Sequence, residues 1–176
     1  MSARTRNLVK LLLTVAVVGA FAALGGVTFA VAAPGKSADV YGVGGGRTDA
    51  GTFKFDLSAH TTGVRDFGHV GVTQTVGSNQ VSYYLDVDCV KVETGFSGGS
   101  AIISGTVKRV SPVSNTFDVA VGDRFLVFAH DGGNPSAAPV DGFFASETSR
   151  NFDCKIAPDA FARNDVTQGN ITVKSA

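Results

Sequence analysis

The sequence has no tryptophan, one methionine and two cysteines, and only 17% of its 176 residues are charged. Nucleic-acid and anionic-membrane binding need a stripe of Lys and Arg, but the largest basic cluster after residue 32 is Lys108-Arg109. The 22 glycines follow no period of three, which excludes collagen, and frequent Phe, Val and Ile exclude general disorder. These absences leave one globular domain, with no nucleic-acid partner, as the expected organisation.

Residues 1–32 are predicted to be a secretory signal peptide. The first ten residues hold three basic side chains and no acidic one, a long apolar run follows, and Ala30-Val31-Ala32 is a small-x-small cleavage site. An uncleaved anchor is the alternative, because the apolar run is long enough to span a bilayer. We expect cleavage and secretion, with membrane contact only through the leader.

The predicted leader carries three of the fifteen basic residues and none of the fifteen acidic ones, so its removal leaves a formal charge of about −3. Residues 33–38 are expected to form a flexible arm, and residues 39–176 a single β domain. The sequence shows no internal repeat and no linker within that domain.

Cys89 and Cys154 are predicted to form a disulfide bond, because an even number of cysteines in an exported chain favours pairing. The alternative is a nucleophile or a metal thiolate. No Cys-x-x-Cys motif is present, and zinc sites normally need more Cys or His at short spacing. A bridge across this separation stabilises by about 4 kcal/mol on the chain-entropy estimate.

The domain is expected to be all-β. Phe53, Phe55 and Leu57 alternate with polar residues, as in a strand that has one face on a core and one in water. Similar alternation recurs along the chain between glycine-rich turns, among them one at Gly44–Gly46, and a further strand is expected at 117–121. About nine short strands predict an antiparallel β-sandwich of jelly-roll or Greek-key type, with a closed barrel as the alternative.

Two strands carry more specific signals. The alternation before Cys89 places Tyr83 on the core face and Tyr84 in solvent, and it slips by one residue at Cys89, which predicts a bulge or a change of sheet there. Residues 125–129 are apolar on both faces, so they are expected to form a central strand that is covered twice. Tyr41, Tyr83 and Tyr84 are candidates for an aromatic platform that binds sugars or peptides, and Tyr84 is the one that alternation exposes.

The order of motifs resembles small exported β-rich proteins of Gram-positive bacteria, mostly of unknown function, and more loosely the post-COAP type of β domain. The motifs that carry the resemblance are glycine turns and apolar alternation, at residues 44–55, 87–92, 101–107, 131–141 and 169–173. The resemblance implies an exported bacterial β-sandwich module. It implies no reaction and transfers no catalytic residue.

Four carboxylates are the weak candidates for a metal site. Asp86 and Asp88 lie two apart on one strand and therefore on one face, where they could act as acid and base or bind Ca²⁺. Asp131 and Asp141 bracket a Gly/Pro loop, which also suits Ca²⁺. The spacing does not fit an EF-hand, and a solvated strand face and ordinary turn chemistry are the favoured interpretations, so we predict no metal or other cofactor.

The three histidines lie in no zinc motif, and no Gly-x-Ser-x-Gly elbow is present. His60 and His69 are expected to meet across a hairpin, and His130 adjoins Asp131. We therefore assign no catalytic or cofactor-binding residue and expect a non-enzymatic binding or structural module outside the cell, with a glycan or protein ligand. The alternatives are a secreted hydrolase that uses His130 with Asp131 or Asp141, and a protease inhibitor that presents loop 132–140.

Overall fold

The computed structural model describes residues 36–95, 98–112, 116–133, 140–157 and 163–175. The predicted leader, and residues 33–35 of the predicted arm, lie outside these ranges. The described chain contains eight strands and one short 3-10 turn. They are β1 (Ala38–Arg47), β2 (Thr52–Thr61), β3 (Asp66–Val76), β4 (Asn79–Gly95), β5 (Gly98–Ser111), β6 (Arg124–His130), β7 (Gly142–Thr148), η1 (Cys154–Ile156) and β8 (Asn164–Ser175).

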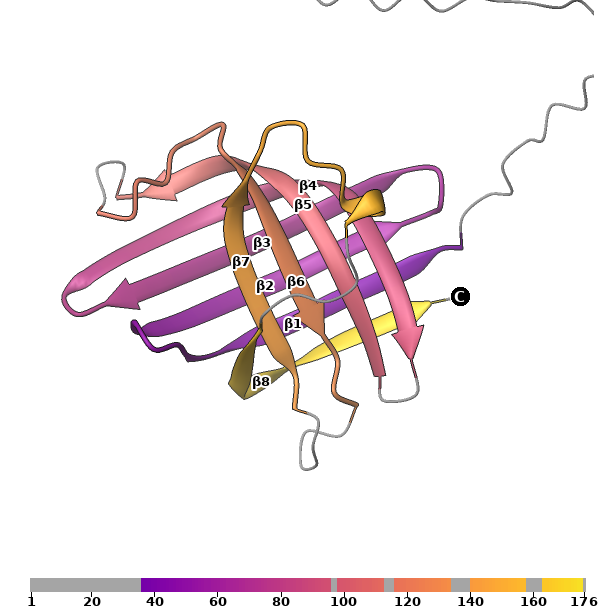
Figure 1. The fold of residues 1–176 in the computed structure, drawn as a ribbon, viewed down its shortest axis with the longest axis horizontal. Coiled ribbons are helices and arrows are strands. Elements are labelled where there is room, and N and C mark those ends of the chain that lie inside the picture. The colour runs from indigo at the N-terminus through magenta and orange to yellow at the C-terminus, as the bar shows by residue number, and fades with distance from the viewer. Residues whose placement is uncertain (1–35, 96–97, 113–115, 134–139, 158–162, 176) are drawn as a thin grey trace, which may run out of the picture. The chain divides into compact units, whose positions relative to one another are not determined.

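The strands form one antiparallel sheet that closes in a ring, in the order of the sequence from β1 to β8 (Figure 1). The prediction of an antiparallel all-β fold is confirmed, and the ring corresponds to the closed barrel that was the alternative. The consecutive order differs from a jelly-roll or Greek key, because each strand pairs with the one that follows it in the chain.

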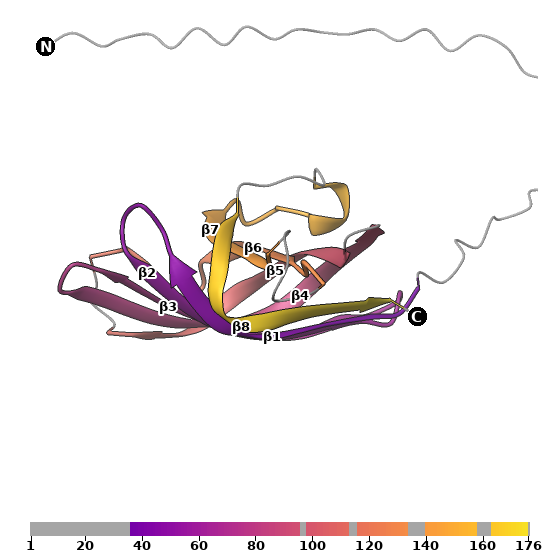
Figure 2. The ribbon, with the colours of Figure 1, turned by 90° about the horizontal axis from the view of Figure 1, so that it is seen from below.

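The ring is uneven. Long strands β4 and β5, of 17 and 14 residues, run from one layer into the other, so that β6 and β7 cross over β1 to β3 (Figures 1 and 2). The β7–β8 ladder contains only two residue pairs, whereas β1 and β8 pair along almost their whole length. The β7–β8 junction is therefore a seam that backbone pairing alone does not close.

The core fills the ring with the residues that alternation places inside. Phe55 stacks on Phe143 with ring centroids 4.3 Å apart, and Phe53 lies 5.7 Å from the same ring. Tyr83 faces the core as predicted and packs against Phe125. Burial raises the pKa of the Tyr83 hydroxyl, which has no hydrogen-bond partner within the described part of the chain.

Gly44–Gly46 were expected in a turn but belong to β1, and the hairpin turn follows at residues 48–51. The reason is steric. A Cβ on Gly46 would lie 2.2 Å from the Asp165 carbonyl oxygen and 2.8 Å from the Phe53 ring. One on Gly44 would lie 2.5 Å from the Gln168 carbonyl oxygen and 3.2 Å from the Phe55 ring. These glycines thus make room for the β8 backbone and for the core phenylalanines, whereas sequence reasoning attributed them to a turn.

The strand expected at residues 117–121 is also absent, although residues 116–133 are described. Residues 117–121 lie in a loop that ends in a turn before β6. Within this loop Asp118 has a positive φ of 57°. Phe117 and Val119 still pack against the core, so their alternation reflects burial without strand pairing.

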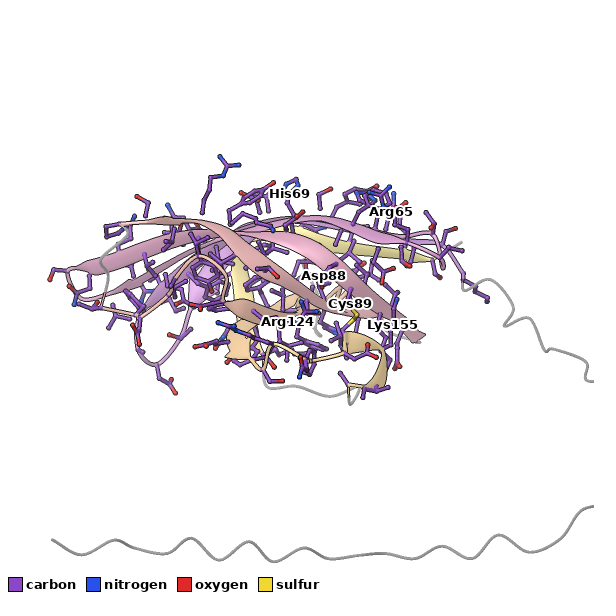
Figure 3. All side chains as sticks on the ribbon, turned by 90° about the horizontal axis from the view of Figure 1, so that it is seen from above. Arg65, His69, Asp88, Cys89, Arg124 and Lys155 are labelled. Carbon is purple, nitrogen blue, oxygen red and sulfur yellow. A yellow bond between two sulfur atoms is a disulfide. The ribbon has the colours of Figure 1, made fainter. Side chains whose placement is uncertain are left out.

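The predicted irregularity at Cys89 is confirmed, because the β4–β5 register shifts between Val87 and Cys89. Val87 and Val90 both face the core, while Cys89 turns outward. In Figure 3, Arg65 and His69 lie on one side of the sheet, and Cys89 lies on the other side together with Arg124 and Lys155.

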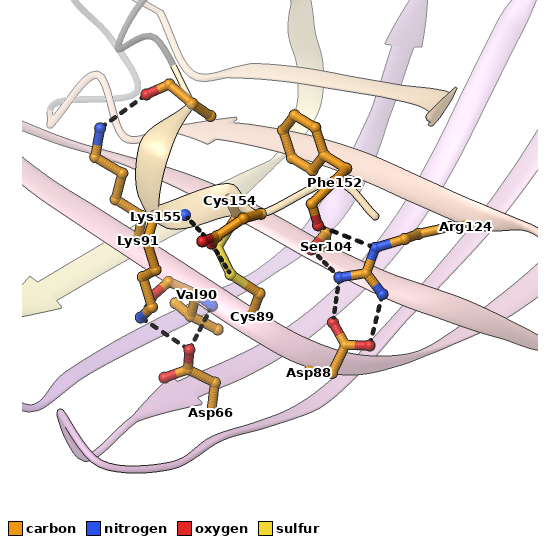
Figure 4. The surroundings of a disulfide bond; sticks show 12 residues. Asp66, Asp88, Cys89, Val90, Lys91, Ser104, Arg124, Phe152, Cys154 and Lys155 are labelled. Carbon is orange, nitrogen blue, oxygen red and sulfur yellow. Dashed lines mark hydrogen bonds and ion pairs between the residues drawn. A yellow bond between two sulfur atoms is a disulfide. The ribbon is translucent and has the colours of Figure 1, made fainter. Parts of the chain in front are cut away.

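Residues 149–157 cover the outer face of β5 and β6, and we call them the cover segment. Beneath it lies a second apolar cluster that contains Ile102, Leu126 and Phe128, which confirms that β6 is covered on both faces. The predicted disulfide is present, with Cys89 and Cys154 joined at an S–S distance of 2.05 Å (Figure 4).

Polar contacts reinforce the disulfide. Lys155 bonds Asp66 at 2.8 Å and donates to the Val90 carbonyl, while Asp66 accepts the Val90 N–H at 3.0 Å. Burial alone would raise the pKa of Asp66, but hydrogen bonds from Lys155, Thr61 and the Val90 N–H outweigh it and hold this pKa below its ordinary value. Asp66 on β3 is therefore an ionised anchor for the cover segment.

Candidate functional site

Asp131 and Asp141, the predicted loop candidates for Ca²⁺, bind backbone amides at the seam. The Asp141 carboxylate accepts the Ile171 N–H at 2.5 Å, and the Asp131 carboxylate accepts the Val173 N–H at 3.0 Å. Each carboxylate also accepts a backbone N–H from the loop that follows β6, Asp141 from Gly132 and Asp131 from Gly133. Residues 171 and 173 present their N–H groups at the edge of β8 that β7 leaves largely unpaired, so the two carboxylates satisfy amides that strand pairing leaves open.

Asp86 and Asp88 both face solvent from β4, and each lies near a different cation. Arg124 donates two hydrogen bonds of 2.7 and 2.8 Å to the Asp88 carboxylate, and a third of 2.9 Å to the Ser104 hydroxyl (Figure 4). Lys108 lies 4.0 Å from Asp86. The Asp88 pair belongs to the contacts around the cover segment, because Arg124 also donates to the Phe152 carbonyl at 3.3 Å.

His130 bonds Ser100 across the β5–β6 ladder, with 2.9 Å between Nδ1 and the serine Oγ. Its Nε2 is buried and has no hydrogen-bond partner among the described residues. Burial lowers the pKa of His130, and the charge of Arg163 lowers it further, against smaller opposing effects of Asp131 and Asp141. The carboxylates proposed as its catalytic partners accept backbone bonds at the seam.

Within the described ranges, no three His, Cys, Asp or Glu residues are grouped as metal ligands would be. Residues 134–139, most of the loop expected to act in the inhibitor hypothesis, lie outside the described residues.

The densest group of functional side chains lies elsewhere, on the outer face of β1 to β5, and we call it the ring face. It consists of five aromatic or imidazole rings and two guanidinium groups. They belong to Tyr41, His60, Arg65, Phe67, His69, Tyr84 and Arg109. Antiparallel register brings them together, since His60 pairs with Phe67, and Tyr84 pairs with Arg109.

The rings form two stacks. In the first, Phe67 stacks on His60 at 5.0 Å, Tyr41 meets His60 edge-on at 5.2 Å, and Arg65 lies over Phe67. In the second, Tyr84 lies between His69 at 5.3 Å on β3 and Arg109 at 4.9 Å on β5. The stacks fix one another, because each ring has a neighbour against its face or edge.

A shallow depression of about 960 Å³ adjoins the second stack. Gly71 is part of its lining, and the Asp56 carboxylate accepts the Gly71 N–H at 3.1 Å. A Cβ at this position would lie 2.6 Å from that carboxylate, so the contact requires glycine. Cationic side chains of Lys54, Lys108 and Arg109 also line the depression, against the single carboxylate of Asp56.

The first stack contains a hydrogen-bonded relay. His60 Nδ1 lies 2.7 Å from Asp39 Oδ1, and His60 Nε2 lies 3.0 Å from Ser58 Oγ. An ionised carboxylate only accepts, so Nδ1 carries the proton toward Asp39, and Nε2 of the neutral ring accepts the serine hydroxyl proton. Serine, histidine and aspartate thus lie in the order that activates a nucleophile.

Sequence reasoning found part of this surface. It placed Tyr84 outside, and it allowed His60 and His69 to meet across a hairpin; the register instead sets His69 opposite Ser58, two residue pairs away from His60. It missed the relay. The available signal was Ser58-x-His60, which puts both side chains on one strand face, whereas the contribution of Asp39 depends on the β1–β2 register.

A second depression, of about 480 Å³, lies at one end of the ring and is lined by core phenylalanines Phe53, Phe117 and Phe143 with Gln74 and Asn164. It is largely apolar and has no titratable side chain in its lining.

No protein-family profile matches the chain, and no curated protein or solved structure shows significant similarity to it. In the described part of the chain, no helix has the length and apolar character needed to cross a bilayer.

Proposed function

We propose that the protein is an exported binding module whose ring face binds a partner protein. The observation that carries the proposal is the packing of five rings and two guanidinium groups on one solvent-facing side of the sheet. Tyr, Phe and Arg are enriched at protein interfaces, and side chains already held by their neighbours lose little entropy on binding.

A protein suits this face better than a glycan. A sugar packs its C–H groups against a bare aromatic face, but Tyr84 has His69 on one side and Arg109 on the other. His60 is likewise contacted by Phe67 and Tyr41. The stacks therefore present ring edges and polar atoms to solvent, which a protein surface matches with its own side chains and backbone.

The partner surface is expected to be acidic. Three cationic side chains and the Asp56 carboxylate line the depression beside the second stack, and Asp86 lies 4.0 Å from Lys108, so these groups carry a local excess of positive charge, although the chain as a whole has a formal charge of zero. Local positive potential of this kind steers acidic partners and rejects basic ones.

Action outside the cell is supported by two features. The basic and apolar start of the chain has the pattern of a secretory leader, and the disulfide that holds the cover segment is typical of proteins that fold under oxidising conditions.

A photo-crosslinking amino acid at residue 43 tests the proposal. Val43 is 67% exposed, faces outward from β1 and lines the depression. The matched control position is Ile156, which is 84% exposed on the cover segment. Irradiation in a culture of the producing organism is expected to crosslink an acidic protein from residue 43 and not from residue 156.

Specificity is checked by Arg109→Glu and Tyr84→Ala, each combined with the crosslinker at residue 43. Both variants are expected to lose the adduct, and added salt is expected to weaken it. The same adducts from both positions, or adducts that neither variant removes, would contradict the proposal, as would binding of the purified domain to a cell-wall glycan through the ring face.

A further inference from the structure

We propose that Ser58 is a reactive nucleophile that takes acyl groups from small esters with an apolar or aryl portion, with His60 as its general base and Asp39 as the positioning residue. This activity goes beyond partner binding and does not depend on it. It rests on the relay in which His60 contacts Ser58 at 3.0 Å and Asp39 at 2.7 Å.

The relay is held from several directions. Asp39 lies on β1 directly opposite His60 on β2, so the strand register fixes their approach. Phe67 stacks on the imidazole and Tyr41 contacts it edge-on, which limits rotation of the ring. His60 keeps 21% of its side chain exposed, Asp39 keeps 49%, and Ser58 is only partly buried, so a small molecule can reach the relay from solvent.

The surroundings indicate both the substrate and a limit on the rate. The Tyr41 and Phe67 side chains are each about 40% exposed and offer apolar contact beside the relay. The β2 backbone, however, is paired on both sides with β1 and β3, so its amides have ladder partners and do not form an oxyanion hole. The register places Tyr41 and His69, whose side chains can donate, on either side of Ser58, and we therefore expect slow turnover of activated esters.

In the first step Ser58 Oγ attacks the ester carbonyl carbon and its proton passes to His60 Nε2. The bond to the leaving alcohol breaks, and His60 returns the proton to that alcohol, which leaves an acyl group on Ser58. Water then attacks the acyl carbon and gives its proton to His60, the bond to Ser58 Oγ breaks, and His60 reprotonates the serine. The sum is ester plus water to acid plus alcohol.

A fluorophosphonate probe tests the nucleophile directly. Ser58 would displace fluoride and form a phosphorus–oxygen bond, which peptide mass spectrometry locates. Labelling is expected at Ser58, and Ser58→Ala should abolish it. Folding of each variant is verified by its thermal transition. A folded wild-type chain that takes no label, or takes it at another serine, overturns the proposal.

Hydrolysis of 4-nitrophenyl acetate separates the role of His60 as general base from that of Asp39 as positioning residue. His60→Gln is expected to slow it by about 10²–10⁴-fold, the usual contribution of a general base. Asp39→Asn should slow it less and change the pH profile, because an amide at this position favours the wrong tautomer of the ring.

Ser100 provides the matched control. It also bonds a histidine, His130, but the other ring nitrogen of His130 has no partner among the described residues. Ser100→Ala should leave labelling and hydrolysis unchanged. Relay variants that alter only the unfolding temperature, with hydrolysis unchanged, would show a purely structural hydrogen-bond chain and overturn the proposal.

The experiment is independent of the binding proposal. Ser58→Ala is expected to leave crosslinking from residue 43 intact, whereas Arg109→Glu is expected to remove crosslinking and leave fluorophosphonate labelling intact. Failure of either proposal is therefore distinguishable from failure of the other.

Discussion

The outer surface of the sheet has two regions that differ in chemistry. On β5 and β6 the outward side chains include Ile102, Leu126 and Phe128, and the cover segment encloses them behind the disulfide. On β1 to β4 the outward side chains include rings, charges and hydroxyls, and the Tyr41 and Phe67 rings remain about 40% exposed. Both regions follow the same two-residue alternation, so the chemistry of the outward positions, and not the strand pattern, separates a second core from a surface available for recognition.

The largest expected difference is in the unfolding free energy that a Phe→Ala substitution costs in each of the two regions. Phe128 is 4% exposed under the cover segment, and Phe67 is 40% exposed on the ring face. Phe128→Ala should cost about 3–5 kcal/mol of unfolding free energy, because it leaves a cavity. Phe67→Ala should cost less, because the Phe67 side chain is already partly in solvent and its removal leaves no enclosed cavity. Urea unfolding of both variants measures the difference, and equal losses would show that the ring face is part of the stabilising core.

Release of the cover segment should have the next largest effect. Cys89→Ser or Cys154→Ser is expected to lower the unfolding free energy by about 2–5 kcal/mol, since the bridge closes a loop of 65 residues. The stacks of the ring face should survive, because none of their residues contacts the bridge. Denaturant titration gives the loss, and Phe67→Ala is the comparison variant. A loss as small as that of Phe67→Ala would mean that apolar contacts alone hold the segment.

Much of this contrast could be predicted from the sequence. Alternation assigned Tyr83 to the core and Tyr84 to solvent, and the doubly apolar run at residues 125–129 indicated a strand covered on both faces. The disulfide followed from cysteine number and export. These features depend on local periodicity or on a single pair, which a sequence displays directly.

The remaining features depend on register and ring closure. Asp39 meets His60 only because the β1–β2 turn sets those residues opposite each other. Asp131 and Asp141 accept backbone N–H groups at the β8 edge because the β7–β8 ladder has only two residue pairs. No local sequence pattern predicts that a strand edge will be unpaired. Gly44–Gly46 were misinterpreted for a related reason, since a glycine that makes room for a distant ring has the same local signature as a turn glycine.

Acid should weaken the covered region through Asp66. Its folded-state pKa lies below the ordinary value of 3.8, so the ionised form is favoured by folding. The stabilisation is complete above that ordinary value and is lost as pH falls through the folded-state pKa. Asp66→Asn should therefore reduce stability at neutral pH, and the gap to wild type should narrow below about pH 3.8. Unfolding curves across this range check the prediction, and a constant gap would contradict it.

The smallest expected effect lies at higher pH, where His130 titrates. Burial and the nearby Arg163 lower its pKa below the ordinary value of 6.5, so the unfolded chain binds a proton that the folded chain resists. Stability should then decline as pH falls below about 6.5 toward the folded-state pKa, with no further loss from this residue beneath it. His130→Gln should remove this slope while leaving the Asp66 transition in place. Thermal unfolding of both chains across this pH range measures the slope, and a slope that persists unchanged in His130→Gln would contradict the assignment to His130.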